Sequence, residues 1–200
     1  RGTPLLAHGD IATLSFHATK VFHTAEGGAL VCRSREVAER VSLMSRFGHS
    51  GEEAYLDMGI NAKLSELHAA MGICVLPHVS ELIAARRQRS QWYDETLAGL
   101  PLQRPVVPGE LEYNFAYYPV VFPSHETMQR VRDSLMRHDI FPRRYFYPSL
   151  NTLPYLPEVS RTRCPVSESL VSRVLALPLS HQMTETDTQK IARIVRNALS

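Results

Sequence analysis

Lys20 is the residue of this chain whose type and place most clearly suggest chemistry. It is one of three lysines among 22 Lys and Arg residues, and it lies on a short polar segment between two apolar segments. A lysine amine that is partly shielded from water can attack an aldehyde and form a Schiff base. From the residues alone, the alternative is a solvated surface lysine with no chemical role.

The cofactor that uses such an amine is pyridoxal phosphate. A lysine holds its aldehyde, and its phosphate needs hydroxyl and backbone N–H donors. Ser15, at the end of the apolar segment before Lys20, is a suitable hydroxyl donor. The two residues therefore predict one covalent anchor and one phosphate contact in the same part of the chain.

Two strands joined by a loop are predicted to position Lys20. Residues 10–16 (DIATLSF) are rich in strand formers, and residues 29–33 (ALVCR) form a short apolar run. The turn signal Glu26-Gly27-Gly28 lies just before the second run. We expect a hairpin-like unit with Lys20 on its connecting segment.

Helices are predicted to follow this hairpin. Ser34 is a suitable N-cap, and apolar residues at helical spacing continue after it. The same spacing predicts a helix from about Leu64 to Val75 and another over His78–Leu97. Pro77 separates the two, because proline disrupts a helix interior.

The second half of the chain changes in character. Proline becomes frequent, and Phe115–Phe122 (FAYYPVVF) and Val174–Leu177 (VLAL) are predicted strands, with a short strand at Ile140–Phe141. Helices are predicted from Ser124 to about His138 and from Thr184 to the end. This order of elements is typical of a compact α+β domain.

Composition excludes several classes of protein. With 44% hydrophobic and 21% charged residues, the chain is typical of a soluble globular protein. A net charge of +2 without a basic run argues against nucleic-acid binding. We expect no apolar stretch as long as a transmembrane helix, and no signal peptide. Cys32, Cys74 and Cys164 are isolated, so neither a disulfide nor a metal site is expected, and the expected compartment is the cytoplasm.

Three motifs occur in order along the chain. They are SFHATK at 15–20 with EGG at 26–28, GINAKLSE at 59–66 with AAMG at 69–72, and YPSL at 147–150 with LPL at 177–179. Together they resemble the DegT/StrS-type sugar aminotransferases, a fold-type I branch of the pyridoxal-phosphate enzymes. The resemblance runs through essentially all 200 residues.

This resemblance implies an α/β fold, namely the C-terminal part of a fold-type I aminotransferase. Residues 1–76 would be the C-terminal part of the large cofactor-binding domain, 77–98 a connecting helix, and 99–200 a small α+β domain. In the family, the residues that pair with the pyridine nitrogen and stack on the ring precede the lysine. The 200-residue chain is therefore expected to lack the N-terminal half of the site.

The resemblance also implies roles for individual residues. Lys20 would be the Schiff-base lysine and the acid/base of the proton shift, and Ser15 a phosphate ligand. Asn61 would reach the phosphate in the neighbouring subunit, because the family shares its sites across a homodimer. Lys63 departs from the arginine that many members carry there, and it resembles the branch that acts on dTDP-linked keto-deoxysugars.

The implied reaction is transfer of an amino group from an amino acid, with glutamate expected, to a nucleotide-linked keto-sugar. Two alternatives stay open. Some relatives dehydrate sugars with histidine in place of the lysine, and Lys20 argues against this. The other alternative is a truncated, non-catalytic relative that acts only in dimerisation or partner binding, which the expected lack of half the site favours. For Asn61, an ordinary turn asparagine beside Gly59 also remains open.

Overall fold

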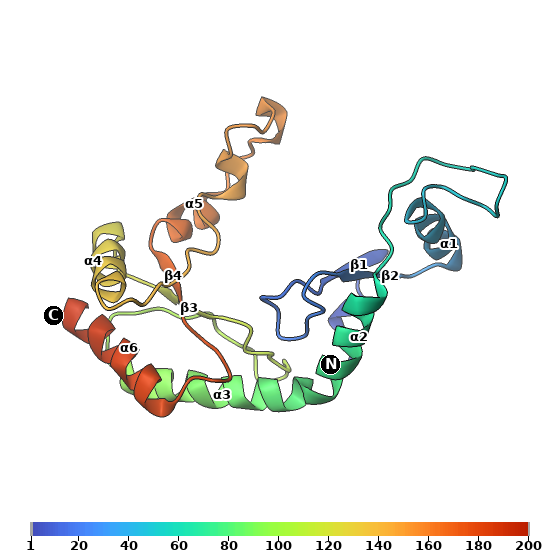
Figure 1. Ribbon diagram of the computed structural model, residues 1–200. Coiled ribbons are helices and arrows are strands. Elements are labelled where there is room, and N and C mark those ends of the chain that lie inside the picture. The colour runs from blue at the N-terminus through green and yellow to red at the C-terminus, as the bar shows by residue number, and fades with distance from the viewer. Residues whose placement is uncertain (1, 200) are drawn as a thin grey trace. The chain divides into compact units, whose positions relative to one another are not determined.

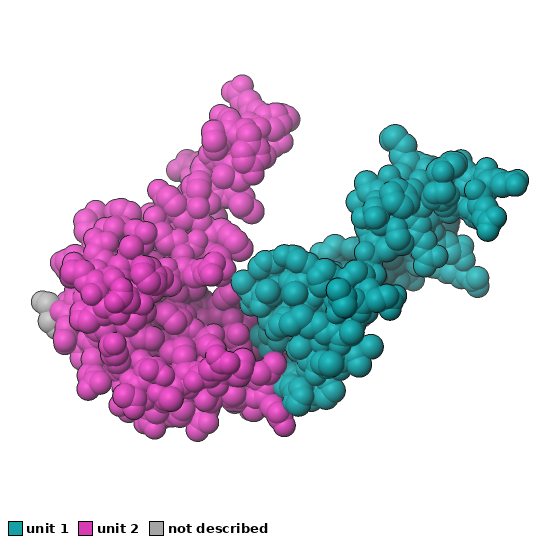
Figure 2. Space-filling view, viewed as in Figure 1, with its two compact units in different colours: residues 1–80 teal, residues 81–200 magenta. Residues whose placement is uncertain are grey.

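The computed structural model describes residues 2–199, and the chain divides into two compact units, residues 1–80 and 81–200 (Figure 1, Figure 2). Each unit contains one two-stranded sheet. The first unit holds, in chain order, a 3-10 turn at Leu5–Ala7, strands β1 (Ile11–Ser15) and β2 (Gly28–Cys32), helices α1 (Arg35–Met44) and α2 (Glu66–Val75), and a 3-10 turn at Leu76–His78. The second holds most of α3 (Val79–Thr96), then β3 (Tyr118–Val121), α4 (His125–Met136), 3-10 turns at Leu150–Thr152 and Glu158–Ser160, α5 (Pro165–Val171), β4 (Val174–Leu177) and α6 (Glu185–Leu199).

In the first unit, β1 and β2 form an antiparallel pair with Ser15 opposite Gly28. A side chain cannot replace Gly28 without a shift, because a Cβ atom there would lie 2.8 Å from the carbonyl oxygen of Leu14. Helix α1 packs against β2. This pairing confirms the predicted hairpin, with Lys20 on its connecting segment.

Serine is the N-cap residue of three helices, α1, α2 and α4. Each hydroxyl oxygen accepts a backbone N–H three residues ahead, which satisfies a donor that the helix itself leaves unpaired. The three bonds are Ser34 with Val37 at 3.2 Å, Ser65 with His68 at 3.3 Å, and Ser124 with Thr127 at 3.2 Å. The predicted caps at Ser34 and Ser124 are confirmed.

The second unit is built around an apolar core. On β3, which pairs with β4, alternate residues Tyr118 and Val120 are fully buried. Helices α4 and α6 pack against each other and contribute to the same core. The buried members of this core are Tyr93, Leu97, Tyr118, Val120, Phe122, Met128, Val131, Leu135, Leu175, Leu177, Ile191, Ala192, Ile194 and Val195.

The strand predicted at Phe115–Phe122 forms only at Tyr118–Val121. Phe115 has a φ of 49°, in the left-handed region, which no regular strand contains. The predicted strand was therefore too long at its start. The strand at Val174–Leu177 is confirmed with its predicted bounds.

The strand predicted at Ile140–Phe141 is wrong. The N–H of Ile140 bonds the carbonyl oxygen of Leu135 at 3.1 Å, so it closes the end of α4 instead of joining a sheet. Pro142 has no N–H to offer. The segment that follows α4 therefore pairs with β4 only through a single bridge, from Arg143 to Ala176.

The continuous helical segment Glu66–Thr96, 31 residues long, contains one stretch that is long and apolar enough to cross a membrane. The sequence expectation that no such stretch exists was therefore wrong. Length and composition are weak evidence for a membrane span, because core helices of soluble proteins pass the same test.

The boundary between the units falls within the segment predicted to be a connecting helix at 77–98. Helix α3 covers most of that segment, and the greater part of it belongs to the second unit. Assignment of 1–76 and 99–200 to a large and a small domain stays a prediction.

Candidate functional site

A closed loop between β1 and β2 carries Lys20. At its neck, the N–H of Phe16 bonds the carbonyl oxygen of Gly27 and the N–H of Thr24 bonds that of Phe16, each at 2.9 Å. The Phe16 ring meets the Phe22 ring edge-on, with their centroids 4.9 Å apart. These contacts give the loop a defined shape, so the residues at its tip are positioned by it.

Lys20 is half-buried on this loop. Its backbone N–H bonds the carbonyl oxygen of His17 at 2.9 Å, which closes a tight turn. None of the hydrogen bonds or ion pairs among residues 2–199 involves the Lys20 ammonium. A partly desolvated amine without a protein partner is available for reaction with an external group.

Ser15 is the last residue of β1 and lies on the same hairpin as Lys20. Its side chain is exposed. Its Oγ accepts the N–H of His17 in a long contact of 3.5 Å. Such a weak bond leaves the hydroxyl able to donate to an external oxygen atom. The predicted amine and the predicted hydroxyl therefore lie on one hairpin.

The side chain of His17 is already used inside the loop. Its Nδ1 lies 2.9 Å from the hydroxyl of Thr19, and its Nε2 lies 3.6 Å from a carboxylate oxygen of Glu26. When protonated, His17 forms an ion pair with Glu26. Glu26, the only Asp or Glu in residues 16–27, is thus a partner of histidine.

Asn61 lies on a different segment of the first unit, which we call the arm (residues 45–63). Its backbone forms an isolated bridge with Arg46. Its side-chain Oδ1 accepts a hydrogen bond from Nζ of Lys63. No hydrogen bond in the described part of the chain joins Asn61 to Lys20 or Ser15.

Two glycines allow backbone segments in and next to the arm to approach each other very closely. A Cβ at Gly48 would lie 1.8 Å from the carbonyl oxygen of Asp57, and one at Gly59 would lie 2.4 Å from the carbonyl oxygen of Met44. Gly48 also has a φ of 79°. A residue with a side chain could not take the place of Gly48 or Gly59 without a shift of the backbone around it.

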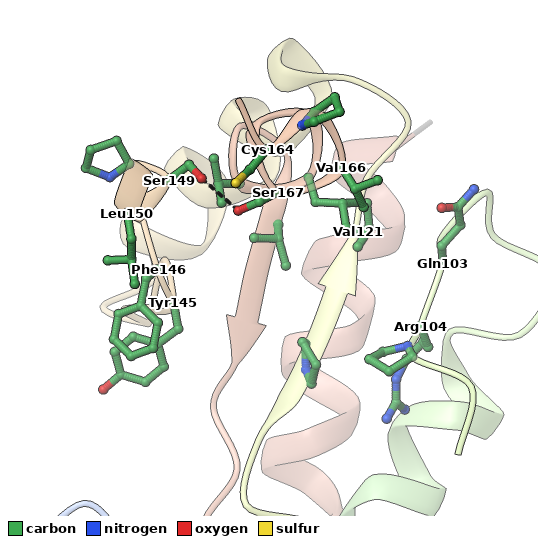
Figure 3. A pocket seen from close by; sticks show the side chains of 17 residues that line it. Gln103, Arg104, Val121, Tyr145, Phe146, Ser149, Leu150, Cys164, Val166 and Ser167 are labelled. Carbon is green, nitrogen blue, oxygen red and sulfur yellow. Dashed lines mark hydrogen bonds between the residues drawn. The ribbon is translucent and has the colours of Figure 1, made fainter. Parts of the chain in front are cut away.

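A cavity of about 1010 Å³ lies in the second unit and is lined mainly by apolar side chains (Figure 3). Val121 of β3, Val166 of α5 and the ring of Phe146 contribute to its walls. Its polar groups include the hydroxyls of Ser149 and Ser167, which lie 2.7 Å apart. The Ser149 hydroxyl donates to Oδ1 of Asn151 at 2.6 Å, so it accepts from the Ser167 hydroxyl. The motif at 147–150 marked this region in the sequence, but no pattern indicated a cavity.

The comparisons with known proteins match this picture. Residues 1–196 match the DegT/DnrJ/EryC1/StrS aminotransferase family. The chain belongs to this family. Its predicted membership is thereby confirmed.

Two curated members illustrate the similarity. The dTDP-4-amino-4,6-dideoxy-D-glucose transaminase of Shigella dysenteriae is 34% identical over 197 residues, which cover 96% of this chain and 53% of that protein. The Escherichia coli protein of the same name is 28% identical, and the match covers 85% of this chain and 47% of that protein. The chain spans about half the length of the curated relatives that it matches.

Solved aminotransferase structures share the fold. DesI, solved in the presence of its TDP-sugar product, is 30% identical with a TM-score of 0.87, covering 98% of this chain and 51% of that one. The aminotransferase TlmJ from Streptoalloteichus hindustanus is 22% identical with a TM-score of 0.89, covering 99% of this chain and 54% of that one. The predicted fold class is confirmed: mixed helix and strand, and the C-terminal portion of a pyridoxal-phosphate-dependent aminotransferase.

Membership of the DegT/DnrJ/EryC1/StrS family implies pyridoxal phosphate, and the donor set of the hairpin fits part of that cofactor. The amine of Lys20 suits the aldehyde, and the hydroxyl of Ser15 suits a phosphate oxygen. A charge partner for the pyridine nitrogen is not evident on the loop, because Glu26 is directed to His17. The described residues also contain no group of three or more His, Cys, Asp or Glu side chains that could hold a metal ion.

Proposed function

We propose that this chain supplies the C-terminal part of an enzyme that transfers an amino group to a dTDP-linked keto-deoxysugar, with glutamate as the amino donor. Membership of a sugar aminotransferase family supports amino transfer to a nucleotide-linked sugar. The relative from Shigella dysenteriae is named as a transaminase of a dTDP-linked aminodideoxyglucose, which supports the choice of nucleotide.

The observation that carries the proposal is the half-buried amine of Lys20 on its closed loop. Bound pyridoxal phosphate supplies an aldehyde and an electron sink for the amino transfer. Lys20 would hold the cofactor by its aldehyde group through Nζ. The Lys20 amine would also act as the acid and base that moves a proton during the amino transfer.

Ser15 and Asn61 are assigned to the phosphate in this proposal. The Ser15 hydroxyl donates from the same hairpin as Lys20. Asn61 donates from the arm to the site of the neighbouring subunit in a homodimer, which accounts for the lack, among the described residues, of a hydrogen bond between Asn61 and the Lys20 loop. Residues outside 1–200 supply the pyridine partner and the stacking ring.

Fixing the bound cofactor with borohydride and mapping the labelled peptides tests the assignment of Lys20. In the protein that carries this chain, the label should lie on Lys20, and Lys20→Ala should remove it together with the visible cofactor absorbance. Lys190→Ala is the matched control and should keep both signals. A retained absorbance band in Lys20→Ala overturns the assignment.

The 200-residue chain tested alone should behave differently. Lys20 and Ser15 provide one covalent bond and one phosphate contact, so the amine has little advantage over Lys63 or Lys190. The label should therefore spread over several amines. Stoichiometric label on Lys20 alone would show that the chain carries a complete site.

One observation favours the alternative of a non-catalytic partner-binding protein, namely the exposed apolar side chains of the first unit, such as Met58 and Leu67. Both functions require a covering partner, and homodimerisation is the proposed one. Sedimentation of the chain at high concentration should show a species heavier than the 22.6 kDa monomer. A strictly monomeric chain would count against the shared site, and specific labelling of Lys20 separates the enzyme from the partner-binding protein.

A further inference from the structure

Two contacts hold the ammonium of Lys63, although the residue is exposed. Its Nζ donates a hydrogen bond to Oδ1 of Asn61, and it lies 4.4 Å from the centre of the Phe47 ring. The face of an aromatic ring attracts a cation, and a carboxamide oxygen accepts from one. Two separate partners for one ammonium indicate a preferred side-chain orientation.

The contact with Lys63 also decides which way the carboxamide of Asn61 is turned. A lysine ammonium has three donors and no acceptor, so only the oxygen of the carboxamide can face it. The amino group, Nδ2, must then point to the other side. Among the described residues, Nδ2 makes no hydrogen bond, so it is free to donate to an external acceptor.

Backbone contacts of the arm bring the three residues together. The N–H of Phe47 bonds the carbonyl oxygen of Ile60 at 3.2 Å, and Arg46 forms a bridge with Asn61. Phe47 has a φ of 62°, a left-handed conformation that is uncommon for an aromatic residue. Strained backbone of this kind points to a function for the side chain that it places.

We propose that Lys63 is a positioning residue that turns the carboxamide of Asn61 so that Nδ2 faces the phosphate of the cofactor, while the Phe47 ring holds the ammonium in place. The inference rests on the proposed function, in which Asn61 contacts that phosphate. Lys63 acts through Asn61: its donated bond polarises the carboxamide and fixes its direction. The group bound at Nδ2 is an anionic phosphate oxygen, which accepts from such a donor.

The orientation of the Asn61 carboxamide can be measured without cofactor. Its side-chain NH₂ signals are recorded in a ¹⁵N–¹H spectrum of the protein that carries this chain. Asn61→Ala assigns the signals by removing them. Lys63→Met keeps the length of the side chain and loses the charge, so both signals should shift. Lys63→Arg should restore positions close to the original ones. Signals that stay in place in Lys63→Met overturn the proposal.

A double-mutant cycle on the affinity for pyridoxal phosphate separates positioning from direct contact. Lys63→Met should weaken binding about threefold to fivefold, the order expected for one charged contact at an exposed site. In the Asn61→Ala background, the same change should have no further effect, because coupled residues are not additive. Additive losses would show that Lys63 contacts the cofactor by itself and would overturn the positioning role.

A third variant extends the cycle to the ring. Phe47→Leu keeps an apolar side chain and removes the ring face, so it should shift the Asn61 signals in the same direction as Lys63→Met, by less. If Asn61→Ala leaves the affinity unchanged, the phosphate role of Asn61 fails and the positioning role fails with it. The assignment of Lys20 is read from the borohydride label and survives that outcome.

Discussion

The two units of this chain differ in how much of their apolar surface they bury themselves. The second unit has a continuous core that includes the fully buried Tyr118 and Phe122. In the first unit, the buried residues among those described are Thr24, Gly48 and Gly72, none with a large apolar side chain. Apolar surface left in water on this scale marks a contact with another chain segment or partner.

Large apolar side chains of the first unit are open to solvent. Met58 on the arm is 87% exposed, and Leu67 and Ile73 on α2 are 84% and 73% exposed. The three proposed cofactor residues, Lys20, Ser15 and Asn61, all lie in this unit. The second unit contains the cavity that Val121 helps to line. The unit that carries the proposed chemistry thus depends on a covering surface, and the unit with its own apolar core carries none of the three.

The largest expected effect is on the core of the second unit. Phe122→Ala should lower the free energy of unfolding by about 3–5 kcal/mol, because a fully buried ring is replaced by a cavity. The matched change in the first unit, Leu67→Ala, should lower it by less than about 0.5 kcal/mol, since this side chain is already in water. Urea unfolding of the 200-residue chain measures both. Equal losses would mean that Leu67 is covered in solution, for example by a second copy.

Helix caps give a smaller and closely matched comparison. Ser124→Ala should destabilise the second unit by about 1 kcal/mol, because the N–H of Thr127 loses its acceptor. Ser34→Ala removes the same kind of bond from α1. That loss should raise hydrogen exchange locally in α1 and leave the main unfolding transition in place, because α1 contains no buried residues. A shift of the main transition in Ser34→Ala would show that the two units unfold together.

Local patterns predicted most elements correctly because the signals are local. Apolar spacing and serine caps identified α1 and α4, and the turn before Gly28 identified the hairpin around Lys20. The strand at Ile140–Phe141 failed because the N–H of Ile140 is used by the end of α4, which depends on how that helix terminates. Tertiary context of this kind cannot be read from a run of two apolar residues.

For the candidate site, motif order pointed to Lys20, Ser15 and Asn61, but their arrangement needed coordinates. The contact of Lys63 with Phe47 joins residues 16 positions apart in the chain, through the backbone crossing of the arm. Spacing alone does not show such a crossing. In the same way, the solvent exposure of α2 could not be predicted. An apolar helix that is buried within its own chain has the same sequence pattern as one that is covered only by a partner.

The smallest expected effect is the pH dependence of the second unit through Asp187. At the start of α6, its carboxylate accepts the backbone N–H of Thr184 at 2.9 Å and the Thr184 hydroxyl at 2.7 Å. These bonds, the backbone one first, hold the pKa of Asp187 below its ordinary value. A pKa that is lower in the folded state stabilises the fold at pH values above the unfolded pKa, and that stability is lost as the pH falls through the folded pKa.

The free energy of unfolding should therefore decrease as the pH falls below the ordinary pKa of an aspartate. Asp187→Asn keeps an acceptor oxygen but carries no charge and cannot titrate, so its stability at neutral pH should be lower and its decrease in acid shallower. Urea unfolding at a series of pH values measures both slopes, and identical slopes would show that the bonds to Thr184 do not persist in solution.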